Sequence, residues 1–171
     1  MKRPLFLCGA FLPCFLLAQP DTLWVPTNGS TVPYVVSYEP VRNDPQYTRI
    51  GKFAFDTSRV AVELDYKRGH PSGVLRAYYP DGRPMIFAVY GWKTLHGDWA
   101  EYDEVGAITL KGKYKHGKRN GKWALKKEAT IGRYKKGLKH GKWSYSENGR
   151  VVRTEKYRKG LLKRTRTFDT N

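Results

Sequence analysis

The feature that most constrains this chain is a repeated ten-residue motif. It reads Y-K-H-G-K-R-N-G-K-W at Tyr114–Trp123 and Y-K-K-G-L-K-H-G-K-W at Tyr134–Trp143, with looser copies at Tyr90–Trp99 and Tyr66–Leu75. In each copy a Gly follows the Tyr by 7 residues, and a large apolar residue follows that Gly by 2. A recurring period of this kind indicates an array of small, similar structural units.

Each unit has the pattern of two short strands joined by a turn. Residues 97–102 and 107–114 place alternate side chains on opposite faces and flank a turn at Asp103–Gly106. Equivalent turns are Pro80-Asp81-Gly82 and Glu147-Asn148-Gly149. Asp-Gly and Asn-Gly favour hairpins because the turn needs residues with positive φ. The sequence therefore predicts an all-β fold, an elongated antiparallel β-meander of successive hairpins.

The large apolar positions of the motif have a second implication. A single hairpin cannot bury its apolar face, so neighbouring units must stack. Leu75, Trp99, Trp123 and Trp143 should then form a hydrophobic spine along the sheet, the alternative being an aromatic platform for a ligand. The unit from Tyr114 to Tyr134 has only 20 residues and lacks the usual turn, so we expect a tighter connection between its strands.

The motif resembles a known repeat. Gly97-Asp-Trp-Ala-Glu-Tyr102, Gly121-Lys-Trp-Ala-Leu125 and Gly141-Lys-Trp-Ser-Tyr145 are similar to the G-x-W-x-x-Y core of the MORN repeat in its bacterial variant form. The resemblance covers about residues 66–164. It implies an elongated antiparallel β array that serves as an interaction or scaffold module, and some bacterial members of the family are antitoxin components.

The segments before and after the repeats have other compositions. Residues 1–18 combine Lys2 and Arg3 with a short apolar run that ends at Ala18, which predicts a signal peptide; lipid attachment at Cys14 or Cys8 is an alternative. Residues 19–48 are rich in proline and predict an extended lead-in, with residues 35–38 as an edge strand. The repeat domain is expected over residues 49–164 and a C-terminal tail over 165–171. We expect an exported protein, in the periplasm or at the outer membrane, without a transmembrane segment in the mature chain.

Charge is distributed unevenly along the chain. The net charge is +17, and residues 111–171 hold 21 Lys and Arg against 4 Asp and Glu. Many of these cations lie in the loops between repeats. These loops recur at the same position of each repeat, so they should all lie at one edge of the sheet. This predicted basic ridge comprises Lys115, Lys118, Arg119, Lys122, Lys135, Lys136, Lys139, Lys142, Arg158 and Lys159. Such a ridge suits an anionic lipid, a glycan at a membrane surface or an acidic protein. Nucleic acid is not expected because of the export signal.

No set of residues predicts catalysis. His96 and His140 occupy the same repeat position and should lie about 19 Å apart, too far to share a metal. The acidic residues Glu101, Asp103 and Glu104 have no further partner in the pattern, and both cysteines lie in the predicted signal peptide. We therefore expect no enzyme activity, metal or cofactor.

Two binding functions remain open at this point, and an enzyme with an unrecognised site, which would show turnover and a concave pocket, is the third hypothesis. One is an interaction or scaffold module in the cell envelope that binds an anionic component or an acidic protein through the ridge. The other is an antitoxin- or immunity-like protein that neutralises a toxin by protein–protein contact. The first predicts salt-sensitive attachment to envelope material, and the second a stoichiometric, salt-resistant protein partner.

Overall fold

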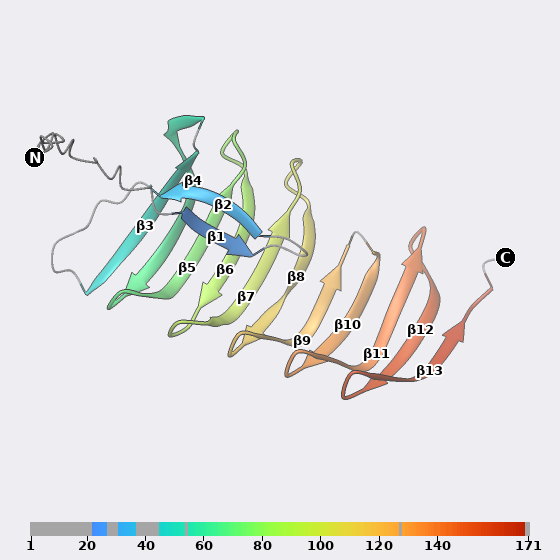
Figure 1. Cartoon of the computed structure of the whole chain (residues 1–171). Coiled ribbons are helices and arrows are strands. Elements are labelled where there is room, and N and C mark those ends of the chain that lie inside the picture. The colour runs from blue at the N-terminus through green and yellow to red at the C-terminus, as the bar shows by residue number, and fades with distance from the viewer. Residues whose placement is uncertain (1–21, 27–30, 37–44, 54, 127, 170–171) are drawn as a thin grey trace, which may run out of the picture.

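The fold is a single β-meander. The computed structural model describes residues 22–26, 31–36, 45–53, 55–126 and 128–169, with side chains from residue 45 onward. In this part of the chain 13 strands form one antiparallel sheet whose strand order follows the order along the chain. Figure 1 shows the strands from Gln46 onward side by side in this order. The strands are β1 (Thr22–Pro26), β2 (Thr31–Val36), β3 (Gln46–Phe53), β4 (Asp56–Lys67), β5 (His70–Tyr78), β6 (Pro84–Tyr90), β7 (Leu95–Tyr102), β8 (Ile108–Lys115), β9 (Lys118–Leu125), β10 (Thr130–Lys135), β11 (Leu138–Glu147), β12 (Arg150–Arg158) and β13 (Leu161–Thr167). The predicted all-β meander is confirmed.

Because consecutive strands pair, the connections alternate between two edges of the sheet. The turns that follow β4, β6, β8, β10 and β12 lie at one edge, called here the inter-repeat edge, and the turns that follow β5, β7, β9 and β11 lie at the other, called the hairpin edge. Backbone bonds fix the inter-repeat turns relative to one another. The N–H of Gly117 donates to the carbonyl of Leu95 over 2.8 Å, and that of Gly137 donates to Arg119 over 2.9 Å. The β8–β9 turn is therefore held by the start of β7, and the β10–β11 turn by the start of β9.

The two faces of the sheet have opposite character. In β8, Leu110 is buried and Tyr114 is half-buried on one face, whereas Lys111, Lys113 and Lys115 are exposed on the other. This alternation continues through β9 and β10. We call the first the aromatic face and the second the open face.

Aromatic rings form a continuous row along the aromatic face. The rings of Trp99, Tyr114, Trp123, Tyr134, Trp143 and Tyr157 contact one another edge to face in that order. Their centroids are 5.0–6.4 Å apart, a spacing that favours this geometry. Trp123 and Trp143 are 0% and 1% exposed. The predicted hydrophobic spine is thus confirmed.

Glycine permits this burial. A Cβ atom on Gly112 would lie 2.2 Å from the indole ring of Trp123, so the ring packs directly against the backbone of β8. Trp143 packs in the same way against Gly132 of β10, so each of these two tryptophans contacts the strand before its own and links one repeat to the next.

The 20-residue unit differs from the expectation of a tighter connection. Residues 126–129 join β9 to β10, and the N–H of Ala129 donates to the carbonyl of Lys126. Asn148 and Gly149 alone join β11 to β12, so the shorter unit does not have the shorter turn. Its strands are shorter instead, with 8 and 6 residues against 10 and 9.

The ends of the sheet depart in part from the predicted segments. The predicted signal peptide and residues 37–38 lie outside the described residues. Within the lead-in, β1 and β2 form a hairpin, and β2 pairs with β3 only through Val35 and Val36. Pro33 in β2 pairs only toward β1, as expected for a residue without an N–H group. At the other end β13 runs to Thr167, so residues 165–167, predicted as tail, belong to a strand.

No helix in the described part of the chain is long and apolar enough to cross a membrane.

Candidate functional site

The inter-repeat edge carries most of the predicted ridge. Its successive turns bring six of the ten predicted cations to this edge, namely Lys115, Lys118, Lys135, Lys136, Arg158 and Lys159, and all six are exposed. The backbone bonds between turns keep these groups in line. A row of cations of this kind can follow an extended anion.

Two predicted ridge residues have a different position. Arg119 and Lys139 are half-buried on the aromatic face. The guanidinium of Arg119 lies 4.5 Å from the ring centroid of Trp123, and the ammonium of Lys139 lies 4.4 Å from that of Trp143. Both also lie within 5.5 Å of the next tyrosine of the aromatic row. They contribute to the fold through cation–π contacts rather than lining the edge.

The remaining two, Lys122 and Lys142, extend onto the open face. There the structure adds exposed cations that the ridge prediction did not include: Lys111, Lys113, Arg133, Lys156, Arg164 and Arg166. The period of two along each strand is the signal that could have found those in β8, β10 and β12, because they have the parity opposite to the tyrosine of their strand. Strand β13 has no tryptophan or tyrosine, and its two arginines are placed on the open face by their register with Lys156 and Thr154. The edge and the open face together form one surface, called here the basic surface.

Like charges face each other across neighbouring strands of the basic surface. Lys115 is paired in register with Lys118, and Lys122 with Arg133. Cross-strand neighbours have Cβ atoms about 5 Å apart, and like charges at that distance destabilise the sheet. An anion bound over them would remove this repulsion.

Acidic groups lie elsewhere in the C-terminal half. Glu128 and Glu147 belong to the hairpin edge, Glu155 to the aromatic face, and Asp169 follows β13. The basic surface of β8–β13 therefore contains no acidic side chain of its own within the described residues. Among the described residues, Asp98 of β7 forms an ion pair with this surface, since its carboxylate lies 3.1 Å from Nζ of Lys113.

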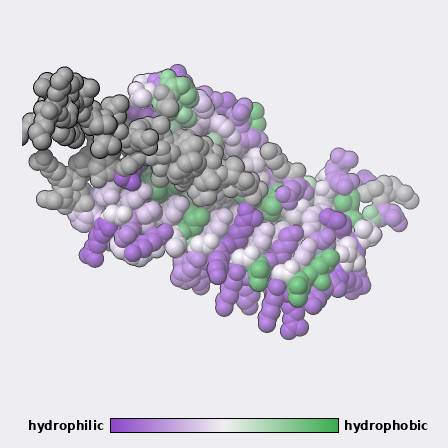
Figure 2. Space-filling view, in the orientation of Figure 1, coloured by the Kyte–Doolittle hydropathy of each residue, from purple (hydrophilic) through white to green (hydrophobic). Residues whose placement is uncertain are grey.

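The inter-repeat edge also exposes apolar side chains. Leu138 is 51% and Leu161 is 63% exposed, next to the turns that carry Lys136 and Lys159. Figure 2 shows hydrophilic side chains projecting along the lower edge of the sheet, with hydrophobic groups between them near its C-terminal end. This edge therefore combines charge with limited apolar contact.

The aromatic face ends in a polar cluster around Glu155. The carboxylate accepts hydrogen bonds from Tyr145 over 2.5 Å and Tyr157 over 2.8 Å, and Arg153 lies 3.6 Å away. Burial acts to raise the pKa of Glu155, but the two hydroxyls and the charges of Arg153 and Lys139 outweigh it and leave the pKa below its ordinary value. Burial and the hydrogen bond to Glu155 raise the pKa of Tyr145 well above its ordinary value. Every polar group here has a protein partner, which indicates a structural role.

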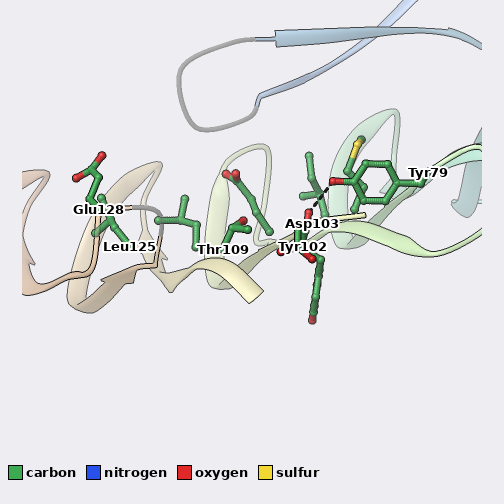
Figure 3. A pocket seen from close by; sticks show the side chains of 10 residues that line it. Tyr79, Tyr102, Asp103, Thr109, Leu125 and Glu128 are labelled. Atoms are coloured by element: carbon green, nitrogen blue, oxygen red, sulfur yellow. Dashed lines mark hydrogen bonds between the residues drawn. The ribbon is translucent and has the colours of Figure 1, made fainter. Parts of the chain in front are cut away.

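A hollow of about 270 Å³ lies near the hairpin edge of the aromatic face, between β6 and β9 (Figure 3). Glu101, Asp103 and Glu128 line it. From the sequence, Glu101 and Asp103 are acidic candidates for catalysis, and the structure adds Glu128 to them. Glu128 points to the side of the sheet on which the β1–β2 hairpin lies, whereas Tyr102 points away from it.

Most polar groups of this hollow are already engaged. Glu101 accepts the indole N–H of Trp99 over 3.0 Å, and Asp103 accepts the backbone N–H groups of Val105 and Ala107. The hydroxyl of Tyr79 donates to the carbonyl of Tyr102 over 2.8 Å, and burial together with the nearby carboxylates raises the pKa of Tyr79. No metal-binding group of three or more side chains occurs among the described residues.

The histidines form one pair that the repeat phase did not predict. The rings of His96 and His116 contact each other with centroids 4.8 Å apart, because the turn after β8 lies beside the start of β7. His70 contacts Trp92, and His140 is paired in register with Arg133.

No protein-family model matches this sequence, and no curated protein matches it significantly.

Proposed function

We propose that this chain is a non-catalytic repeat protein of the MORN type that binds an anionic component of the cell envelope through its basic surface. The observation that carries the proposal is the separation of charge. From β8 to β13 most of the described cations lie on the open face and the inter-repeat edge, with Arg119, Lys139 and Arg153 among the exceptions on the aromatic face, while the acidic residues lie on the aromatic face, at the hairpin edge or after β13. A charged surface that served only for solubility would need no such separation, because scattered charges of both signs keep a protein in solution.

The geometry of the surface suits an extended ligand. Neighbouring strands lie about 4.8 Å apart, so six strands present cations over roughly 24 Å in the direction across the strands. An anionic polymer or a headgroup layer running in this direction meets a new cation at each strand. The export signal expected at residues 1–18 supports an envelope component as the source of that anion.

The test uses inorganic polyphosphate as a soluble probe. We compare the protein with a variant in which Lys118, Lys135 and Lys159 are changed to Ser. The control variant carries Lys52, Lys67 and Arg76 changed to Ser, which removes the same charge from β3, β4 and β5. Affinity should fall with added salt. The slope of log K against log [salt] should decrease by about one for each lysine that contacts the probe.

One outcome of this titration would reject the proposal. If the two triple variants lose the same affinity, the probe senses net charge and the basic surface is not a site. A pull-down from the protein's own envelope adds the second criterion. One protein retained at one-to-one stoichiometry through high salt would support the antitoxin- or immunity-like alternative instead.

A further inference from the structure

A second hollow, of about 340 Å³, lies at the C-terminal end of the open face. Its lining includes four cations, Lys142, Lys156, Arg164 and Arg166, together with Thr154 and Phe168. Small-ligand sites have volumes of roughly 300–1,000 Å³, so the hollow has room for one small molecule.

The register of three strands assembles the cations. Lys142 in β11 is paired with Lys156 in β12, and Lys156 in turn with Arg164 in β13. One row further, Thr154 is paired with Arg166. Cross-strand neighbours have Cβ atoms about 5 Å apart, which places all four charged groups around one small volume. The repulsion among them disfavours the empty hollow and is relieved by a bound anion.

No acidic side chain within the described residues forms an ion pair with these four cations. Glu155 also lines the hollow, but its carboxylate is bound by Tyr145 and Tyr157, which belong to the aromatic face. Asp169 follows Phe168 and does not line the hollow. The positive charge of the site is therefore not neutralised from within.

The two uncharged residues give the hollow a polar floor and an apolar wall. Thr154 is only 9% exposed although it belongs to the open face, so it lies at the bottom of the hollow. Phe168 is 46% exposed, and its N–H donates to the carbonyl of Val152, which fixes its backbone beside β12. Its ring offers an apolar surface to the rest of a ligand whose anionic group meets the cations.

These features together select the ligand. The geometry points to a site for a phosphate monoester carried on a sugar ring, with the phosphate held by Lys142, Lys156, Arg164 and Arg166 and the ring packed on Phe168. A phosphate monoester offers three terminal oxygens that accept charge-assisted hydrogen bonds, and arginine binds such oxygens in a bidentate manner. The inference rests on the proposed function and deepens it, because it assigns one discrete site and a ligand class to the basic surface.

The test is a titration of the full chain by calorimetry at fixed ionic strength. The probes are glucose 6-phosphate, inorganic phosphate and glucose. We expect saturable one-to-one binding of glucose 6-phosphate, weaker binding of inorganic phosphate and no binding of glucose. Binding of inorganic phosphate as tight as that of the sugar phosphate would overturn the role of the ring, and absence of saturable binding would overturn the site.

Variants separate the site from the general charge of the surface. Changing Lys156 and Arg164 to Gln should weaken glucose 6-phosphate binding at least about tenfold, since each loses a hydrogen bond between charged groups. The matched control changes Lys118 and Lys135 to Gln, which removes two charges from the inter-repeat edge of the basic surface, outside the hollow, and should change affinity for glucose 6-phosphate less than about twofold. Phe168→Ala should remove the preference for the sugar phosphate over inorganic phosphate.

Failure of this inference can be told from failure of the proposed function. Equal loss in both double variants would reject the discrete site. If polyphosphate binding still depended on Lys118, Lys135 and Lys159, the proposed function would stand without it. If polyphosphate binding did not depend on those three lysines, the proposed function would be rejected. The discrete site would still be tested separately, by the effect of the Lys156 and Arg164 changes on glucose 6-phosphate binding.

Discussion

The indole ring of Trp143 occupies the space above Gly132. A Cβ atom on Gly132 would lie 2.1 Å from Cδ2 of Trp143, well inside van der Waals contact. The same relationship joins Trp123 to Gly112, and at Trp99 the corresponding neighbour in the preceding strand is Ala88. The burial of each tryptophan thus depends on a small residue in another repeat.

The first prediction concerns that dependence. Gly132→Ala should destabilise the protein by about 1–3 kcal/mol, because the indole must shift to admit a methyl group. Urea unfolding followed by tryptophan fluorescence measures the loss. Combining Gly132→Ala with Trp143→Leu should cost less than the sum of the two single changes, since the smaller side chain leaves room. Strictly additive effects would show that the two residues do not share this space.

A second prediction compares two tryptophans. Trp123→Ala should cost about 3–5 kcal/mol because the ring is fully buried in the aromatic row. Trp92→Ala serves as the control, since Trp92 is 50% exposed and should cost less than about 1 kcal/mol. Similar losses in denaturant unfolding would mean that the row is not the core of the array.

A third prediction separates two adjacent cations of the predicted ridge. Arg119→Ala should reduce stability by about 1–2 kcal/mol, because the guanidinium stacks on Trp123 and Tyr134. Lys118→Ala should leave stability unchanged within about 0.5 kcal/mol and should weaken polyanion binding instead. Thermal unfolding and polyphosphate titration of the two variants provide the measurements. A loss of stability in Lys118→Ala together with a loss of binding alone in Arg119→Ala would contradict the structure.

A fourth prediction follows from Glu155. Its pKa is lower in the folded protein than its ordinary value of 4.5. The ionised carboxylate therefore stabilises the fold at neutral pH, and this contribution is lost as the pH falls below about 4.5 and through the folded-state pKa. Between pH 7 and pH 3 the wild type should lose more stability than Glu155→Gln. Equal losses in urea unfolding at the two pH values would rule out this role for Glu155.

Much of the fold was predictable because its signals are local. Alternation along each strand, the Asp-Gly and Asn-Gly turns and the fixed distance from Tyr to Gly each depend on a few consecutive residues. They sufficed for the meander, the buried tryptophans and the common edge of the inter-repeat turns. Strand order follows chain order, so no long-range pairing had to be guessed.

The positions of individual cations were less predictable. Arg119 and Lys139 lie in loop-rich sequence, yet each has the parity of the tryptophan in its strand and therefore belongs to the aromatic face. The hollow at the C-terminal end depends on register, which shifts between Lys156 and Tyr157. An irregularity of this kind leaves no trace in the repeat pattern, so the grouping of Lys142, Lys156 and Arg164 needed the structure.

One departure from the repeat marks where the row stops. Glu155 is paired with Trp143 where Gly132 is paired with Trp123, and its own partner in β13 is Thr165 rather than a tryptophan. The Glu155 carboxylate, held by two tyrosines, thus occupies the space that the indole of a further repeat would need. The last repeat closes the aromatic row instead of extending it.

The order of the strands has a consequence for how long such a molecule can be. Every strand from β4 to β12 pairs only with its two neighbours along the chain, so inserting one more unit before β12 would replace a single pairing with equivalent ones and leave the others unchanged. Each inserted unit would lengthen the basic surface by two strand spacings, or about 10 Å. The number of repeats would then set how many anionic groups of a polymer the protein can span, and a gene could adjust that reach by duplication alone.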